Sequence, residues 1–171
     1  MTDYQPIYDF NETESKYKWE NFTDQVMGGV SEISTRLMNE DNQNFIRMEG
    51  DVSLKNNGGF IQIRLELATG FKVFKASDFD GIRLYARGQG SGYYLFLRTS
   101  NTFFPWQFFK ASVNTGDDWR TIDIPWNEIV KGDNGTLGNF DPAKLKSIAL
   151  VAYGKEFRAE VDLMRIGFYK K

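Results

Sequence analysis

Hydrophobic and polar residues alternate along the middle of the chain. Apolar side chains occupy every second position in three runs, 61–67, 82–86 and 93–97, with polar or aromatic residues between them. A period of two turns alternate side chains to opposite faces of an extended backbone, so each run predicts a half-buried strand. The glycine-rich segment 88–92 is followed by a strand rather than a helix, which favours a hairpin turn over a phosphate-binding loop.

Extended patterns cover most of the remaining chain, and helical signals are few. Short helical turns are predicted only at 126–130 and at 141–145, where Asp141-Pro142 has the composition of a helix start. The total of about ten strands with one or two short helical turns predicts an all-β sandwich of the jelly-roll type. The further strands are expected at 7–10, 33–37, 45–50, 51–54, 103–109, 119–124, 148–153 and 157–169.

Composition bounds the size of the protein and its chemistry. The 171 residues suit a single domain over 1–171, and the hydrophobic content of 41% is ordinary for a packed core. The chain contains no cysteine and no histidine, which excludes disulfides, thiol nucleophiles and imidazole-dependent catalysis. No cofactor and no metal centre are expected, although carboxylates leave open a hard cation at Asp24.

Charge and hydropathy narrow the choice of partners and compartment. Lysines and arginines number 21 and acids 23, and the formal net charge of −2 gives no overall attraction to nucleic acids. No stretch is apolar enough to insert into a membrane, and residues 1–16 lack the pattern of a secretory or transit signal. We therefore expect a cytoplasmic protein without nucleic-acid partners.

The polar positions of the middle strands form a candidate binding surface. Strand alternation places them opposite the aliphatic core, and neighbouring strands lie about 5 Å apart, so we expect them to gather on one sheet. Arginine forks beside flat aromatic rings suit sugars, carboxylates or an acidic peptide. The alternative is a solvated face on which arginine and tyrosine pair across strands. The predicted binding residues are Gln62, Arg64, Tyr85, Arg87, Tyr94, Arg98 and Gln107.

A hydrolase that lacks histidine and cysteine would need two carboxylates facing each other across a cleft. Nothing in the spacing of the acids selects such a pair, and acids at strand ends usually cap turns or bind arginines. A catalytic role is therefore the least favoured interpretation, and we assign no catalytic residues. The conceivable members of a pair are Asp24, Asp80, Asp123, Glu160 and Asp162.

The segment 24–31 combines the glycines of a loop with the apolar residues of a core. Glycines permit a sharp bend, whereas Val26, Met27 and Val30 favour burial and are expected to fill the end of the sandwich. The chain offers no base at a recognisable spacing to activate Ser31. We therefore predict a structural corner whose residues are Trp19, Asp24, Met27, Gly28, Gly29 and Ser31.

Several short motifs stand in order along most of the chain. They are Trp19, then Asp24-Gln25-Val26-Met27-Gly28-Gly29-Val30-Ser31, Gly58-Gly59-Phe60 with Arg64, Asp80-Gly81-Ile82, Arg87-Gly88, Trp119, Ile124-Pro125 and Glu160-Val161-Asp162. Together they resemble the complex I intermediate-associated protein 30 family over residues 19–169. The resemblance implies a galactose-binding-like jelly roll, similar to carbohydrate-binding modules, and brings no catalytic residues. The absence of the targeting segment found in mitochondrial relatives indicates a bacterial-type member.

The family resemblance also bears on function. Its mitochondrial members assist the assembly of respiratory complex I as chaperone-like factors, which implies a protein partner such as an assembly intermediate. We therefore expect a non-catalytic binding module that engages a protein partner through the arginine and tyrosine face and the glycine corner. The alternative is a carbohydrate-binding module that uses the same face.

Overall fold

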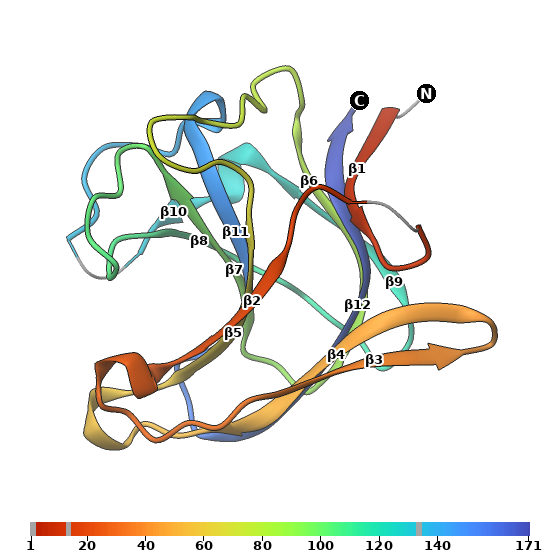
Figure 1. Ribbon diagram of the computed structural model, residues 1–171, viewed down its shortest axis with the longest axis vertical. Helices are drawn as coiled ribbons and strands as arrows, with labels where there is room; N and C mark the ends of the chain where they lie inside the picture. Colours follow the sequence, from red (N-terminus) through yellow and green to blue (C-terminus); the bar gives the residue numbers. More distant parts are fainter. Residues whose placement is uncertain (1–2, 13–14, 133–134) are drawn as a thin grey trace.

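The computed structural model describes residues 3–12, 15–132 and 135–171, and it confirms the predicted β-sandwich jelly roll. Two antiparallel sheets of six strands each pack against one another (Figure 1). The first strand, β1 (Asp3–Asp9), pairs with the last, β12 (Phe157–Lys170). The start of β1 and the end of β12 therefore lie side by side at one end of the sandwich (Figure 1).

Sheet A is built around the long strand β12. The first half of β12 pairs with β4 and the second half with β1, while β6 pairs along its other edge. The strand order is β3-β4-β12-β6-β9, with β1 beside β12. Its other strands are β3 (Ser34–Glu40), β4 (Gln43–Val52), β6 (Gly81–Gln89) and β9 (Arg120–Pro125).

Sheet B has β11 and β7 at its centre. The strand order is β10-β8-β7-β11-β5-β2, so β11 lies between β7 and β5 although it follows them in the chain. The strands are β2 (Trp19–Thr23), β5 (Phe60–Glu66), β7 (Tyr93–Thr99), β8 (Phe109–Ser112), β10 (Val130–Lys131) and β11 (Leu145–Tyr153).

The core lies between the two sheets and contains the alternating apolar residues predicted from the sequence. Ile61, Ile63 and Leu65 of β5 are fully buried, and Leu84 of β6 meets them from the other sheet within one cluster. Along β5 burial alternates at every residue, as the period of two requires. The polar residues between these positions therefore face away from the core.

The strand predicted at 103–109 is wrong, because regular pairing begins only at Phe109. Pro105 has no backbone N–H to offer a neighbouring strand. Side chains bind the backbone of this loop instead. Gln107 Oε1 accepts hydrogen bonds from the N–H groups of Phe103 and Phe104, and the guanidinium of Arg98 donates to three loop carbonyls.

Helical structure among the described residues is limited to four short 3-10 helices. The two predicted turns are confirmed as η3 and η4, whereas η1 and η2 fall in glycine-containing loops for which we predicted no helix. Among the residues that the structure describes, no helix has the length and hydropathy to cross a membrane. The helices are η1 (Asp24–Met27), η2 (Lys55–Asn57), η3 (Trp126–Glu128) and η4 (Pro142–Lys144).

Candidate functional site

The predicted arginine and tyrosine face is divided between the two sheets. Gln62 and Arg64 stand on β5, and Tyr94 and Arg98 on β7, so these residues share the outer face of sheet B. Tyr85 and Arg87 stand on β6, in sheet A. The prediction that all of them lie on one sheet is therefore wrong, because alternation decides which residues point away from the core and not which sheet carries the strand.

On sheet A, Arg87 belongs to an ion-pair network centred on Asp162. The Asp162 carboxylate is almost fully buried and accepts hydrogen bonds from Arg47 Nε and Nη2 and from Arg87 Nε, at 2.8–3.0 Å. Arg87 also binds the carboxylate of Glu40 through both Nη atoms. These hydrogen bonds lower the pKa of Glu40 and raise that of Arg47.

Aromatic rings fill the space around this network. The guanidinium carbon of Arg87 lies 4.7 Å from the ring centroid of Trp119, which stacks on Tyr85 at 5.4 Å. Arg165 covers Tyr85 at 4.4 Å. Arg87 and Tyr85 therefore bind other parts of the same sheet, which is the cross-strand pairing that the alternative interpretation predicts.

On sheet B, the small side chain of Ser147 on β11 lies on the floor of a groove. Ser147 lies in register between Arg98 on one side and Glu66 on the other. Ala149 lies in the next row, between Phe96 and Arg64. Because Ser147 is much smaller than its neighbours on β5 and β7, the surface is hollow over this part of β11. Ala149 is instead buried in a cluster with Phe96 and Phe108, where the groove narrows.

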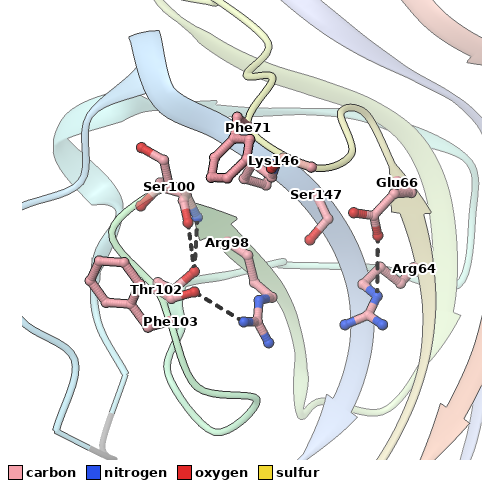
Figure 2. A pocket seen from close by; sticks show the side chains of 11 residues that line it. Arg64, Glu66, Phe71, Arg98, Ser100, Thr102, Phe103, Lys146 and Ser147 are labelled. Carbon is pink, nitrogen blue, oxygen red and sulfur yellow. Dashed lines mark hydrogen bonds and ion pairs between the residues drawn. The ribbon is translucent and has the colours of Figure 1, made fainter.

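Two loops raise the walls of this groove, which has a volume of about 490 Å³ (Figure 2). The β5–β6 loop contributes Phe71, and the β7–β8 loop contributes Phe103. Both rings are exposed, Phe71 fully and Phe103 to 77%. Lys146 holds the β5–β6 loop in place, because its Nζ donates hydrogen bonds to the carbonyls of Gly70 and Lys72 at 2.7 Å.

Arg64 is held in the groove mainly by stacking. Its guanidinium carbon lies 4.1 Å from the ring centroid of Phe22 on β2. Its nearest carboxylate is that of Glu66, whose Oε2 lies 3.9 Å from Arg64 Nε, too far for a hydrogen bond. Arg64 Nε is buried and has no hydrogen-bond partner within the described part of the chain.

Arg98 lies across β11 from Arg64 and binds only neutral groups. Its Nη atoms donate to the carbonyls of Thr102, Phe104 and Pro105 at 3.1–3.2 Å. Among residues 3–12, 15–132 and 135–171, no carboxylate forms an ion pair with it. Burial and the nearby charge of Arg64 lower the pKa of the Arg98 guanidinium.

The other two predicted residues on this side do not line the main groove. Tyr94 lies toward the opposite end of β7, where it packs edge-on against Tyr153 at 5.6 Å and lines a separate hollow. Gln107 is buried within the β7–β8 loop, where its amide also donates to the carbonyl of Gly135. The prediction that Gln107 lies on the sheet face is therefore wrong. Gln62 borders the groove where it narrows over Ala149.

The glycine corner is organised by the carboxylate of Asp24, which is fully buried. It accepts hydrogen bonds from the backbone N–H and hydroxyl of Ser31 and from the N–H of Gly59, at 2.5–2.9 Å. The Ser31 hydroxyl also accepts a hydrogen bond from the N–H of Ser53. Asp24 and Ser31 therefore tie the β2–β3 loop to the β4–β5 loop. The described chain contains no group of acids that could hold a metal ion.

The glycines of this corner are required by Asp24. A Cβ at Gly29 or at Gly58 would overlap the Asp24 carboxyl group. Gly28 ends η1 with a φ of 87°, the left-handed conformation that favours glycine. This part of the predicted corner is supported by the contacts.

The apolar residues of the corner do not fill the sandwich as predicted. Val26 is 69% and Val30 45% exposed, and the side chain of Met27 lies outside the described part of the structure. The corner is held by hydrogen bonds to one buried carboxylate rather than by apolar packing. Trp19 lies at the other end of β2, where it packs against Tyr8 of β1 in the opposite sheet and against Phe10 just after that strand.

The predicted set of binding residues does not include the residues that shape the groove. Ser147 and Ala149 lie within an apolar run of β11, and neither has a chemistry that marks a site. Phe71 and Phe103 are aromatic residues of a kind that the core also needs, and only their position on loops exposes them. Nothing in the local pattern distinguishes them from buried phenylalanines.

The fold is a β-sandwich jelly roll similar to that of carbohydrate-binding modules. The family 11 carbohydrate-binding module of the cellulosomal cellulase Lic26A-Cel5E of Clostridium thermocellum has a TM-score of 0.73 at 14% identity, covering 97% of this chain and 94% of that one. The same family's module in complex with a β-1,3-1,4-mixed-linked tetrasaccharide has a TM-score of 0.71 at 15% identity, covering 96% and 95%. A family 30 carbohydrate-binding module has a TM-score of 0.54 at 14% identity, covering 81% and 91%. At these identities the likeness concerns the fold alone.

The sequence itself identifies the family. Residues 8–162 match the family described as Complex I intermediate-associated protein 30 (CIA30), and the chain therefore belongs to it. This match confirms the resemblance found in the motifs. No curated protein matches the chain.

Proposed function

We propose that this protein is a non-catalytic module that binds a partner protein through the groove on sheet B. The observation that carries the proposal is a pair of arginines, Arg64 and Arg98, that line an open groove. Within the described chain, no carboxylate lies within hydrogen-bonding distance of either guanidinium group. Charged groups inside a finished scaffold are normally paired, as those of sheet A are.

The composition of the groove supports a protein partner. Arginine and aromatic residues are enriched at protein interfaces, and Phe71 and Phe103 stand exposed beside the two arginines. Membership of the CIA30 family supports a partner that takes part in assembling a respiratory complex. The proposed role is to hold such a partner while assembly proceeds.

Capture of partners from the cytoplasmic and membrane fractions of the native cell tests this proposal. The bait is the full chain, with the double variant Arg64→Ala and Arg98→Ala as the test. Arg36→Ala with Arg158→Ala is the matched control, because these two exposed arginines lie on sheet A. We expect the test variant to lose the captured partner and the control to retain it. Equal recovery by both variants would show that the groove is not the binding site.

A carbohydrate ligand is the second candidate, and one observation favours it. Phe104 and Trp106 stack in parallel on the β7–β8 loop, with centroids 4.8 Å apart and planes 4° apart, and both rings are about half exposed. A flat exposed ring of this kind can pack against the apolar face of a sugar. A soluble-glycan array tests the candidate: saturable binding that Trp106→Ala abolishes would support it over a protein partner.

A further inference from the structure

The two guanidinium groups of sheet B flank a strand with no anion between them. Ser147 of β11 separates them, and Figure 2 shows its hydroxyl lying between the side chains of Arg98 and Arg64. No hydrogen bond of the Arg64 guanidinium is formed within the described residues. Arg98 Nε and the Ser147 hydroxyl likewise form no hydrogen bond within the described residues. Unused donors from three neighbouring strands therefore converge on one part of the groove.

This arrangement carries a cost while the groove is empty. Two like charges repel, and burial of the guanidinium together with the charge of Arg64 lowers the pKa of Arg98. Glu66 offsets only part of the charge, since its closest oxygen is 3.9 Å from Arg64 Nε. An anion placed between the arginines would remove the repulsion and occupy the free donors.

The charge of Lys146 does not serve the same role. Its ammonium group donates to two carbonyls of the β5–β6 loop and so holds the wall of the groove. The donors that remain are the planar guanidinium fork of Arg64 and the Nε–H of Arg98, and a guanidinium fork matches the two oxygens of a carboxylate better than a point charge does. The presence of Glu66 beside them keeps the local positive charge modest, which favours a singly charged carboxylate over phosphate.

The width of the groove restricts the form of the ligand. Its sides stand on β5 and β7, which are two strand spacings apart, or about 10 Å between backbones. Side chains on both strands narrow the opening further. An α-helix with its side chains is about 10–12 Å across and does not fit, whereas an extended segment does.

We propose that Arg64, Arg98 and Ser147 form a carboxylate-binding subsite that takes an Asp or Glu side chain from an extended segment of the partner protein. The exposed rings of Phe71 and Phe103 would contact apolar residues on either side of the acid. This inference rests on the proposed function, because it names the chemistry that the same groove recognises.

Titration with a synthetic peptide tests the subsite directly. The probe is the capped peptide acetyl-Leu-Asp-Leu-Asp-Leu-amide, and the control is its analogue with both Asp residues replaced by Asn. We expect calorimetry to show binding of the Asp peptide that is at least about tenfold tighter than that of the Asn analogue. In NMR spectra the Nε–H resonance of Arg64 should move during the titration, and binding should weaken as salt is added.

Single variants assign the effect to the subsite. Arg64→Gln and Arg98→Gln should each weaken binding of the Asp peptide about tenfold, whereas Arg83→Gln on sheet A should leave it unchanged. Arg98→Gln also removes contacts of the β7–β8 loop, so a folded Arg64→Gln protein decides the question if the Arg98 variant unfolds. Arg64 makes no hydrogen bond that the variant would break within the described residues.

Several outcomes would overturn the inference. Equal binding of the Asp and Asn peptides would do so, as would no binding of either. Binding of an oligogalacturonate without binding of the peptide would assign the carboxylate to a sugar ligand instead. Loss of native partner capture by Phe71→Ser with Phe103→Ser, but not by Arg64→Gln, would leave the proposed function standing and remove the carboxylate subsite.

Discussion

On the outer face of sheet A, Arg47 and Arg87 share the buried carboxylate of Asp162, and each of the two also approaches a second acid. On the outer face of sheet B, Arg64 and Arg98 have no carboxylate at hydrogen-bonding distance in the described chain. Both faces arise from the same alternating pattern of residues. The first face satisfies its charges internally and is part of the scaffold. The second leaves donors open above a groove and is suited to a ligand.

The position of small residues explains the difference. In sheet A, the row across the sheet runs through Arg36, Arg47, Asp162 and Arg87, so an acid stands between arginines on neighbouring strands. In sheet B, the corresponding central strand places Ser147 and Ala149 between larger neighbours. A carboxylate on the central strand closes a charge network, whereas a small residue leaves room and unused hydrogen-bond donors.

Loss of the Asp162 carboxylate should have the largest effect on stability. We expect Asp162→Ala to lower the free energy of unfolding by about 3 kcal/mol, because it leaves two half-buried guanidinium groups without their shared partner. Urea denaturation of the variant and the parent measures this. Arg64→Ala serves as the comparison and should cost under about 1 kcal/mol. If Asp162→Ala lowered the free energy of unfolding by less than Arg64→Ala, the assignment of sheet A as the scaffold face and sheet B as the binding face would be wrong.

A double-mutant cycle on Arg64 and Arg98 should reveal repulsion in the empty groove. Each single change to Ala removes the repulsion as well as that residue's own contacts, so the two single costs count the relief twice. The double variant should therefore lose more stability than the sum of the single variants, by about 0.5 kcal/mol for charges that water partly screens. Urea denaturation at low salt measures the coupling, and added salt should reduce it. Coupling of the opposite sign would mean that the two arginines stabilise one another.

Ionisation of buried tyrosines should have the smallest effect on stability, and only at alkaline pH. Burial raises the pKa of Tyr4, on β1 of sheet A, to about 12. Its unfolded value is near 10, so its contribution to stability is fully present below about pH 10 and is lost as pH rises toward 12. Burial also raises the pKa of Tyr93 and Tyr169. Ultraviolet absorbance of tyrosinate should show a late-titrating component that Tyr4→Phe reduces. A titration curve unchanged by Tyr4→Phe would contradict the assignment.

Parts of the site could be predicted from the sequence because they depend on local chemistry. Alternation placed Arg64 and Arg98 opposite the core, and both indeed face outward. The same reasoning placed Tyr85 and Arg87 correctly on the outside of a strand but assigned that strand to the wrong surface. The order of strands within a sheet depends on pairings between segments far apart in the chain, which a local period does not specify.

The glycine corner shows the same limit in another form. The glycines and the buried polar pair of Asp24 and Ser31 belong to one structural feature, as the motif suggested. The reason for the glycines, however, is the space taken by the Asp24 carboxylate, which also meets Gly58 from a separate loop. No local pattern indicates that Gly29 and Gly58 contact the same atoms.

The sequence by itself determined that this is a β-sandwich of the CIA30 family without thiol or imidazole chemistry, because alternation, composition and motif order are properties of the chain. Only the tertiary structure decided which arginines pair with a carboxylate of the same chain. That outcome depends on the residue that each neighbouring strand places beside them. Asp162 stands beside Arg47 and Arg87, and Ser147 stands beside Arg98. Register places Glu20 beside Arg64 as well, and no ion pair joins these two in the described chain. The difference between a scaffold face and a binding face therefore arises from strand register together with side-chain conformation, both of which become visible only when the chain is folded.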